Sequence, residues 1–293
     1  MLKKVLAAML CSIMATAALS SCGKQIDVDD DKSTTTTAAN STTDKNVPEK
    51  NITAADLERF SERSVPQIDL EKSNVKNFTA PKKGDTVIIM KLKGYEGEIK
   101  IKLFSEYAEK GVENFVGHAE NGYYDGLIFH RIISDFMIQG GDPLGTGMGG
   151  ESIWGEKFDG GVNTNVIHAA GAVAYANSGS TATNGSQFYI VTGDTYAEEQ
   201  FAEGYPEDAK QVYMNAGGTP FLDGGYTVFG QVYDGLDIVF AVQDVETDTT
   251  KDPTNPYAQD RPIEDVVIEY VKVGEYNGEE TRWFISDYLD DKK

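Results

Sequence analysis

Residues 129–142 read FHRIISDFMIQGGD, and residues 184–190 read NGSQFYI. In the first stretch an arginine, Arg131, lies within apolar sequence of the kind that forms strands. Because successive side chains of a strand face opposite ways, we expect Arg131 and Ile133 on the face opposite Ile132. A cation that shares a face with large apolar groups is costly unless it has partners or a chemical task. The first stretch therefore predicts a functional arginine on a short strand.

These two stretches resemble the motifs of cyclophilins, the peptidyl-prolyl cis-trans isomerases. The resemblance covers residues 84–274, roughly two thirds of the 293-residue chain. It implies a mainly β fold: a closed eight-stranded antiparallel β-barrel capped by two α-helices. Composition allows one globular core of this size, because 40% of the chain is hydrophobic and it contains 13 Phe and 15 Tyr.

Periodic hydrophobicity predicts a similar architecture from the residues themselves. Residues 99–103 alternate between apolar side chains and lysine, as in a strand with one buried face. Apolar residues at spacings of three and four predict a helix from Glu106 to about Asn121, with Ser105 as its N-cap. Many short strands with few helices favour a closed barrel, which has no exposed edges. The predicted strands are 86–93, 97–104, 128–133, 136–139, 171–175, 187–192, 228–232 and 266–273, and a second helix is predicted at 236–242.

The resemblance also implies a set of site residues. Arg131 matches the catalytic arginine of the cyclophilin motif. The other implied residues form a substrate groove with three parts. The proline pocket is lined by Phe136, Met137, Tyr189 and Leu222; the substrate main chain is held by Gln139 and the backbone of Asn177; the groove is completed by Ala176, Gln187, Phe221 and Tyr226.

Rotation about an X–Pro bond requires a hydrogen-bond donor rather than a nucleophile, a metal or a redox group. Twisting the amide breaks its conjugation and leaves a lone pair on the proline nitrogen. A donor aimed at that lone pair stabilises the twisted state and not the planar one. We therefore expect no cofactor. His118 and His168 have no partners at ligand spacing, so no metal site is predicted, and His130 is expected to be a buried, hydrogen-bonded structural residue.

The chain departs from the best-known cyclophilin pattern at several groove positions. Phe221 stands where many members have tryptophan, Tyr226 where many have histidine, and Tyr189 replaces a phenylalanine. These changes keep the groove aromatic, so they bear on specificity more than on activity. An insertion at 196–218 precedes Phe221, and Pro206 within it begins a predicted short helix. We expect this insertion to form one wall of the groove.

The charge balance excludes a nucleic-acid partner. The chain carries 47 acidic and 26 basic residues, which give a formal net charge of −21, and such a field repels phosphate. Residues 145–150 satisfy the pattern G-x-G-x-x-G, but the sequence ESIWG at 151–155 is not a helix start, as dinucleotide binding would require. A glycine loop beside the substrate groove is the better interpretation.

The N-terminus predicts export and a lipid anchor. Two lysines precede an apolar run at 5–19, which is typical of a signal peptide. The run ends in Leu19-Ser20-Ser21-Cys22, which resembles a bacterial lipobox, so residues 1–21 are predicted to be removed and Cys22 to carry the lipid. A plain signal peptide with an incidental cysteine is the alternative. Residues 22–50 are polar and of low complexity, and they predict a disordered tether.

Two further segments flank the predicted isomerase domain at 84–274. The extension at 51–83 contains a helix start at Thr53, and Leu57 and Phe60 are candidates for docking on the barrel. The sequence leaves open whether this extension is docked or disordered. The acidic tail at 275–293 contains Trp283 and other apolar residues that predict a small surface helix.

Taken together, the sequence predicts an extracytoplasmic prolyl isomerase, lipid-anchored to a bacterial membrane, that assists the folding of exported proteins. Its expected partners are proline-containing unfolded or extended polypeptides, and we expect a monomer. Two alternatives stay open: a proline-peptide binding or chaperone module with incidental catalysis, and a surface adhesin that uses the barrel as a scaffold. The presence of both Arg131 and Gln139 favours the enzyme.

Overall fold

Most of the chain downstream of the predicted tether has a defined structure. The predicted signal peptide at 1–21, Cys22 and the predicted tether as far as residue 48 lie outside the described residues. The computed structural model describes residues 49–64, 66, 69, 72–248, 250, 260–289 and 291–292.

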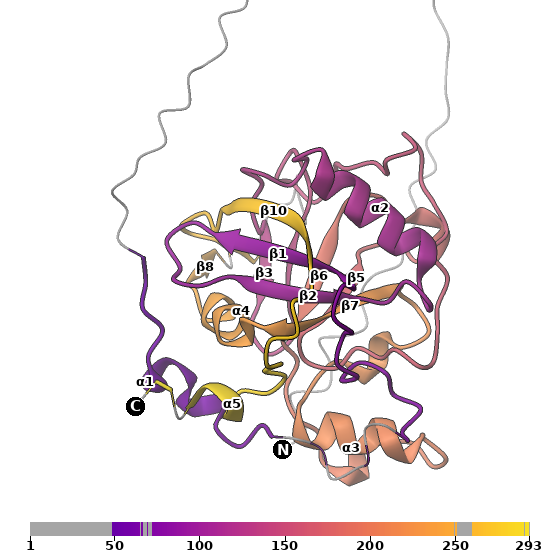
Figure 1. The fold of residues 1–293 in the computed structure, drawn as a ribbon, viewed down its shortest axis with the longest axis vertical. Coiled ribbons are helices and arrows are strands. Elements are labelled where there is room, and N and C mark those ends of the chain that lie inside the picture. The colour runs from indigo at the N-terminus through magenta and orange to yellow at the C-terminus, as the bar shows by residue number, and fades with distance from the viewer. Residues whose placement is uncertain are drawn as a thin grey trace, which may run out of the picture. The chain divides into compact units, whose positions relative to one another are not determined.

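Eight antiparallel strands form one sheet in the order β10-β1-β2-β7-β5-β6-β4-β3 (Figure 1). The prediction of a mainly β fold is confirmed, and each predicted strand has a counterpart. The strands of this sheet are β1 Thr86–Leu92, β2 Ile99–Leu103, β3 Arg131–Ile133, β4 Met137–Gly140, β5 Ala172–Tyr175, β6 Phe188–Val191, β7 Val228–Asp234 and β10 Ile268–Glu275. A separate two-stranded sheet pairs β8 Thr247–Asp248 with β9 Arg261–Pro262.

The barrel is open, so the expectation of a closed barrel was wrong. Within the described residues no ladder joins β3 to β10. The segments that precede these two strands are linked by an isolated bridge between Ile128 and Val267 and by backbone hydrogen bonds, among them one from the N–H of Phe129 to the carbonyl of Val266 at 3.0 Å. β3 has only three residues, and the backbone N–H of Ile132 donates to the carbonyl of Asp260 at 2.8 Å, on the segment that leads into β9. That contact occupies the edge of β3 that a closed barrel would pair with β10.

Two helices cover the ends of this half-barrel, as predicted. In α2 (Glu109–Glu120) the buried Phe115 belongs to the main hydrophobic core, and Asn121 is the C-cap. The helix starts later than expected, because the carbonyl of Phe104 accepts from the N–H groups of residues 107 and 108 and closes a turn. The N-cap is therefore Ala108, and the prediction of Ser105 was wrong.

The second covering helix, α4 (Leu236–Gln243), is buried on all sides, and flanking segments cover its outer face. In the N-terminal extension Phe60 packs edge-on against Phe240, with ring centroids 4.4 Å apart. The guanidinium of Arg63 lies 4.6 Å from the centroid of the Phe240 ring. In the C-terminal segment Tyr288 accepts a hydrogen bond from the backbone N–H of Leu236 at 3.1 Å. A helix with apolar residues on most of its sides must be buried, and the two flanks bury this one, including its Asp237 and Gln243.

The remaining helices are short and lie in the insertion, in the two flanks and in loops between strands. The insertion contains α3 (Glu207–Asn215), which begins after Pro206 as predicted. α3 packs on a separate core cluster, together with Val75, Trp283 and Phe284. The other short helices are α1 Ala54–Leu57, α5 Ser286–Leu289, η1 Glu58–Phe60, η2 Thr181–Thr183, η3 Glu198–Gln200 and η4 Pro220–Leu222.

The N-terminal extension is docked on the domain, a question that the sequence left open. Ile52, Leu57 and Phe60 are at most 2% exposed and belong to the same core cluster as the strands and α4. Over the ranges that the structure describes, no helix combines the length and the apolar character needed to cross a bilayer.

Replacing Phe60 by alanine is expected to lower the free energy of unfolding by about 3–5 kcal/mol, because a buried aromatic ring is lost and a cavity is left. Equilibrium denaturation by urea measures this loss. Glu58→Ala is the control, because Glu58 lies in the same helical turn as Phe60 and its side chain is exposed. This variant should change the free energy of unfolding by about 0.5 kcal/mol or less. Equal midpoints for both variants would show that the extension does not contribute to the core.

Candidate active site

The candidate site lies on the outer face of the β3–β4–β6 ladder. Arg131 pairs in register with Gln139 on β4, and Gln139 pairs with Tyr189 on β6. Directly paired residues share a face. The intervening residues Ile132 and Ile138 point the other way and are at most 1% exposed in the main core. Alternation thus separates a face that builds the core from a face that is free to bind.

The predicted pocket residues gather around one apolar cluster on this outer face. Met137 and Tyr189 are buried there, at 2% and 4% exposure. Phe221, which is 61% exposed, leans over Phe136 with ring centroids 5.7 Å apart. The partly buried members of the cluster include Phe136, Ala176, Leu222 and Tyr226. The structure therefore brings together side chains that come from the β3–β4 turn, β4, β6, η4 and the loops after β5 and η4.

Arg131 keeps most of its donors free. Its side chain is 31% exposed, and its Nε lies 3.6 Å from Oδ2 of Asp260. That separation makes an ion pair but is too long for a hydrogen bond. No other partner for the guanidinium exists among the described residues. The Nη groups can therefore donate to a ligand that lies over β4.

A chain of amide hydrogen bonds runs from β4 to the glycine loop. Gln139 donates from Nε2 to Oε1 of Gln187 at 2.9 Å. Gln187 in turn donates from Nε2 to the carbonyls of Gly147 at 3.0 Å and Gly149 at 2.7 Å. This arrangement leaves Oε1 of Gln139 available as an acceptor for an N–H group of a bound peptide.

The glycine loop wraps around a carboxylate of its own chain. Asp142, which is 1% exposed, accepts from the backbone N–H groups of Leu144, Thr146 and Gly147 at 2.9, 2.9 and 2.6 Å. Burial by itself would raise the pKa of Asp142, but the backbone donors outweigh it and lower that pKa. A Cβ atom on Gly149 would meet Oδ1 of Asp142 at 2.2 Å. The glycines of the G-x-G-x-x-G pattern thus allow a tight loop whose backbone N–H groups already bind the carboxylate of Asp142.

The segment after β5 offers backbone groups to the groove. The side chain of Asn177 is fixed at both ends: Nδ2 donates to the carbonyl of Gly225 at 3.0 Å, and Oδ1 accepts from the N–H of Gly179 at 2.9 Å. The backbone N–H and C=O of Asn177 make no hydrogen bond within the part of the chain that the structure describes. They are therefore free to pair with an extended peptide.

One residue at the site was missed by the sequence analysis. His168, which is 1% exposed, lies parallel to the ring of Tyr189, at 13° and with ring centroids 6.1 Å apart. It also meets the ring of Tyr226 edge-on at 6.2 Å. Its position just before β5, in a run of small residues, gave no signal in the sequence, because the contact depends on how β5 and β6 pair.

His130 is buried, as predicted, but the expectation that it is hydrogen-bonded was wrong. Its side chain is 1% exposed, and neither ring nitrogen has a hydrogen-bond partner within the described ranges. Burial lowers the pKa of His130 to about 4, which outweighs the raising effect of Asp142. The imidazole next to Arg131 is therefore neutral at physiological pH.

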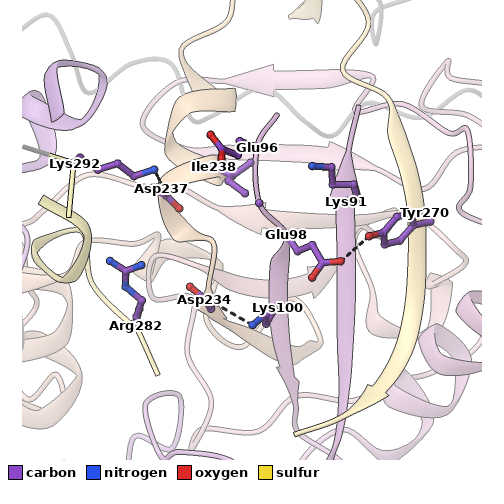
Figure 2. A pocket seen from close by; sticks show the side chains of 11 residues that line it. Lys91, Glu96, Glu98, Lys100, Asp234, Asp237, Ile238, Tyr270, Arg282 and Lys292 are labelled. Carbon is purple, nitrogen blue, oxygen red and sulfur yellow. Dashed lines mark hydrogen bonds and ion pairs between the residues drawn. The ribbon is translucent and has the colours of Figure 1, made fainter. Parts of the chain in front are cut away.

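A second hollow, of about 600 Å³, is lined by other elements and satisfies its own charges (Figure 2). Lys100 lies 3.4 Å from Asp234 and Lys292 lies 3.0 Å from Asp237. Tyr270 donates to Glu98 at 2.6 Å. The remaining cations of its lining also have acidic partners outside the drawn set, namely Lys91 with Glu49 and Arg282 with Asp291. The ion pairs around this hollow fasten the C-terminal segment to β2 and α4. Each lysine and arginine of its lining has an acidic partner, so none is left unpaired for a ligand.

No set of three or more His, Cys, Asp or Glu side chains within the described residues is placed to hold a metal ion.

Comparison with known proteins identifies the family of the half-barrel. A family model described as cyclophilin type peptidyl-prolyl cis-trans isomerase/CLD matches residues 87–273. The chain therefore belongs to the cyclophilin family of peptidyl-prolyl cis-trans isomerases.

Relatives and solved structures support isomerase activity. A candidate peptidyl-prolyl cis-trans isomerase of Staphylococcus aureus is 47% identical over 186 residues, which cover 61% of this chain and 88% of that protein. A candidate bifunctional phosphatase/peptidyl-prolyl cis-trans isomerase of Streptococcus pyogenes is 43% identical over 217 residues, which cover 72% of this chain but only 42% of that longer protein. A cyclophilin-type isomerase of Cryptosporidium parvum, crystallised in the presence of the dipeptide Ala-Pro, superposes with a TM-score of 0.51 at 29% identity and covers 65% of this chain and 99% of that chain.

The buried neutral His130 predicts a loss of stability in mild acid. An unfolded histidine has a pKa near 6.5, so between pH 6.5 and 4 the unfolded chain binds one more proton at this residue than the folded chain. Stability then falls as pH falls through that window, by about 2 kcal/mol between pH 7.5 and 5.

The measurement is urea denaturation of wild type and His130→Leu at both pH values. Leucine removes the titrating ring, and no hydrogen bond is lost, so the variant should lose about 2 kcal/mol less on acidification. All other side chains are the same in the two proteins, so their contributions to the pH dependence cancel in the comparison. Parallel pH dependences for the two proteins would contradict the assignment.

Proposed function

We propose that this chain isomerises X–Pro bonds with Arg131 as the catalytic donor, and that it assists the folding of exported polypeptides from a lipid anchor at Cys22. The observation that supports the catalytic role best is the placement of Arg131. Its Nη groups have no partner among the described residues, and its guanidinium shares the outer face with the apolar cluster around Met137. A guanidinium with unengaged Nη donors beside an apolar pocket suits a substrate that is apolar except at the reacting nitrogen.

The chemistry requires only differential binding. Rotation of the planar amide has a barrier of about 20 kcal/mol because conjugation must be broken. In the twisted state the proline nitrogen gains a lone pair, and Arg131 donates a hydrogen bond to it. A hydrogen bond from a charged donor contributes about 1.5–3 kcal/mol, which corresponds to roughly ten- to a hundredfold in rate. The planar ground state gains no such bond, so this interaction lowers the barrier rather than only improving binding.

The remaining part of the acceleration comes from holding one side of the bond while the other rotates. The proline ring fits the pocket formed by Phe136, Met137, Tyr189 and Leu222. Phe221 leans over Phe136 and shields the edge of this pocket from water. Ala176 and Tyr226 belong to the same cluster and extend its wall.

The substrate main chain is held by groups that are already oriented. Oε1 of Gln139 accepts from a substrate N–H, while Gln187 fixes the amide of Gln139 from behind. The backbone of Asn177 pairs with the extended substrate on the other side of the groove. These groups lie on strands or on a pinned loop, so little entropy is lost in ordering them when a substrate binds.

Arg131→Ala is expected to lower kcat/KM for an Ala-Pro peptide by roughly ten- to a hundredfold, because the transition-state hydrogen bond is lost. NMR exchange spectroscopy of the peptide measures the rate, and circular dichroism verifies the fold. Lys272→Ala removes an exposed cation from β10, outside the site, and serves as the control with unchanged rates.

Two outcomes separate the enzyme from the alternative. A folded Arg131→Ala protein with wild-type rates would contradict the catalytic role. A wild-type protein that binds proline peptides without accelerating their exchange would instead support the proline-peptide binding or chaperone module.

The location is proposed from the N-terminal sequence. Cys22 follows a lipobox-like stretch, and the polar segment that separates it from Glu49 has, as a random coil, a span of roughly 30 Å. A tether of that reach places the groove outside the membrane surface, within reach of extended polypeptides as they emerge from export. The formal net charge of −21 keeps the domain away from anionic headgroups.

Cys22→Ser is expected to abolish lipid attachment and to move the protein out of the membrane fraction, because the thiol is the acylated group. Radiolabelled palmitate incorporation and fractionation of the producing bacterium measure this change. Cys11→Ser, which alters only the predicted signal peptide, is the control and should behave as wild type. A Cys22→Ser protein that still incorporates label would contradict the anchor.

A further inference from the structure

Asp223 is the acceptor of a group of four hydrogen bonds directly behind the proposed proline pocket. It follows Leu222 at the end of η4. One carboxylate oxygen, Oδ1, accepts from the backbone N–H of His168 at 3.0 Å and from its Nδ1 at 2.7 Å. The other, Oδ2, accepts from the hydroxyl of Tyr205 at 3.0 Å and from that of Tyr213 at 2.6 Å. Both lone-pair sides of the carboxylate are thus engaged by the protein itself.

The two tyrosines come from the inserted segment at 196–218. Tyr213 lies on α3 and is fully buried. α3 packs on the cluster formed with Val75, Trp283 and Phe284, so its apolar face is turned to the flanking segments. The insertion therefore contacts the groove through Asp223, which accepts hydrogen bonds from the hydroxyls of Tyr205 and Tyr213. The expectation that the insertion itself forms a wall of the groove is not supported by this packing.

His168 carries the contact onward to the pocket. Its imidazole lies parallel to the ring of Tyr189 and edge-on to that of Tyr226, and these two rings meet edge-on at 5.9 Å. Backbone bonds hold the same region: the N–H of Thr219 donates to the carbonyl of His168 at 2.8 Å, and the N–H of Ala170 donates to the carbonyl of Gly217 at 3.0 Å. The end of the insertion and the start of β5 are thereby joined.

We propose that the insertion is a positioning device for substrate binding, with Asp223 as the positioning residue through which it acts. Asp223 orients Leu222 on one side and, through His168, the rings of Tyr189 and Tyr226 on the other. This inference rests on the proposed proline pocket and deepens it by identifying what sets the pocket width. A pocket held at one width loses less entropy on binding than one that must be ordered by the substrate.

The test removes the two hydroxyls and keeps the rings. In Tyr205→Phe/Tyr213→Phe the KM for an Ala-Pro peptide is expected to rise about threefold or more, with kcat within about twofold, because ground-state and transition-state binding weaken together. NMR exchange spectroscopy over a range of peptide concentrations separates the two constants. Tyr196→Phe is the matched control, since Tyr196 lies in the same segment and packs on Tyr213 without reaching Asp223.

A second pair of variants tests the carboxylate directly. Asp223→Asn keeps one oxygen acceptor and should retain a KM between those of wild type and Asp223→Ala. This graded rescue distinguishes positioning from a purely structural role, for which thermal stability would change while KM stayed constant. Thermal unfolding and near-ultraviolet circular dichroism of all variants report on the fold.

The inference is overturned if the double phenylalanine variant has wild-type KM, or if kcat falls in proportion to thermal stability with KM unchanged. Arg131→Ala, measured beside these variants, separates this failure from failure of the proposed function. An inactive Arg131→Ala protein together with a wild-type-like double variant refutes only the role of the insertion. Equal rates for wild type and Arg131→Ala refute the proposed site itself.

Discussion

The alternation of side chains along the β3–β4–β6 ladder is the constraint on which both the core and the candidate site depend. Arg131, Gln139 and Tyr189 face outward because Ile132, Ile138 and Ile190 face inward. A slip of one residue in the register would bury the guanidinium and expose the isoleucines. The cost of burying an unpaired charge far exceeds the cost of any local irregularity. The register is therefore fixed by the same residues that form the candidate site.

A connected polar network then gives the outer face its definite shape. Asp142 fixes the glycine loop through backbone N–H groups, the loop carbonyls hold Gln187, and Gln187 holds Gln139. Each link is a hydrogen bond between partly or fully buried groups, where an unsatisfied partner would be costly. The side-chain amide of Gln139 is consequently held in one orientation. On the other side of the candidate site Asp223 holds His168, which packs on the rings of Tyr189 and Tyr226.

Sequence reasoning succeeded where information is local. Alternation placed the strands, spacing placed α2 and α4, and two motifs led to residues that the structure brings together on one face. Reasoning failed where the outcome depends on distant partners. The barrel was expected to be closed, but Asp260 occupies the free edge of β3. His130 was expected to be hydrogen-bonded, and nothing in the sequence indicates that its neighbours offer no acceptor.

Docking of the extension was beyond prediction for a related reason. Leu57 and Phe60 have the apolar character that docking needs, but the surface they cover exists only after α4 has packed on the sheet. The contact from Tyr213 to Asp223 is likewise set by tertiary packing, since the nine intervening residues could place the hydroxyl in many positions. Local sequence patterns show which residues are apolar enough to be buried. Which of them are buried depends on the tertiary contacts of the folded chain.

The burial of α4 has a consequence for how such proteins can be recombined. The region shared with the family, residues 87–273, does not include Phe60 or Tyr288, which cover the outer face of this helix. A fragment cut at the family boundary would present Phe240 and its neighbours to water and would tend to self-associate. The folded unit of this chain is therefore larger than the region that matches the family. Among the described residues the N-terminal flank enters the core at Ile52, so an exchange of the N-terminal region should keep Ile52 and the residues that follow it.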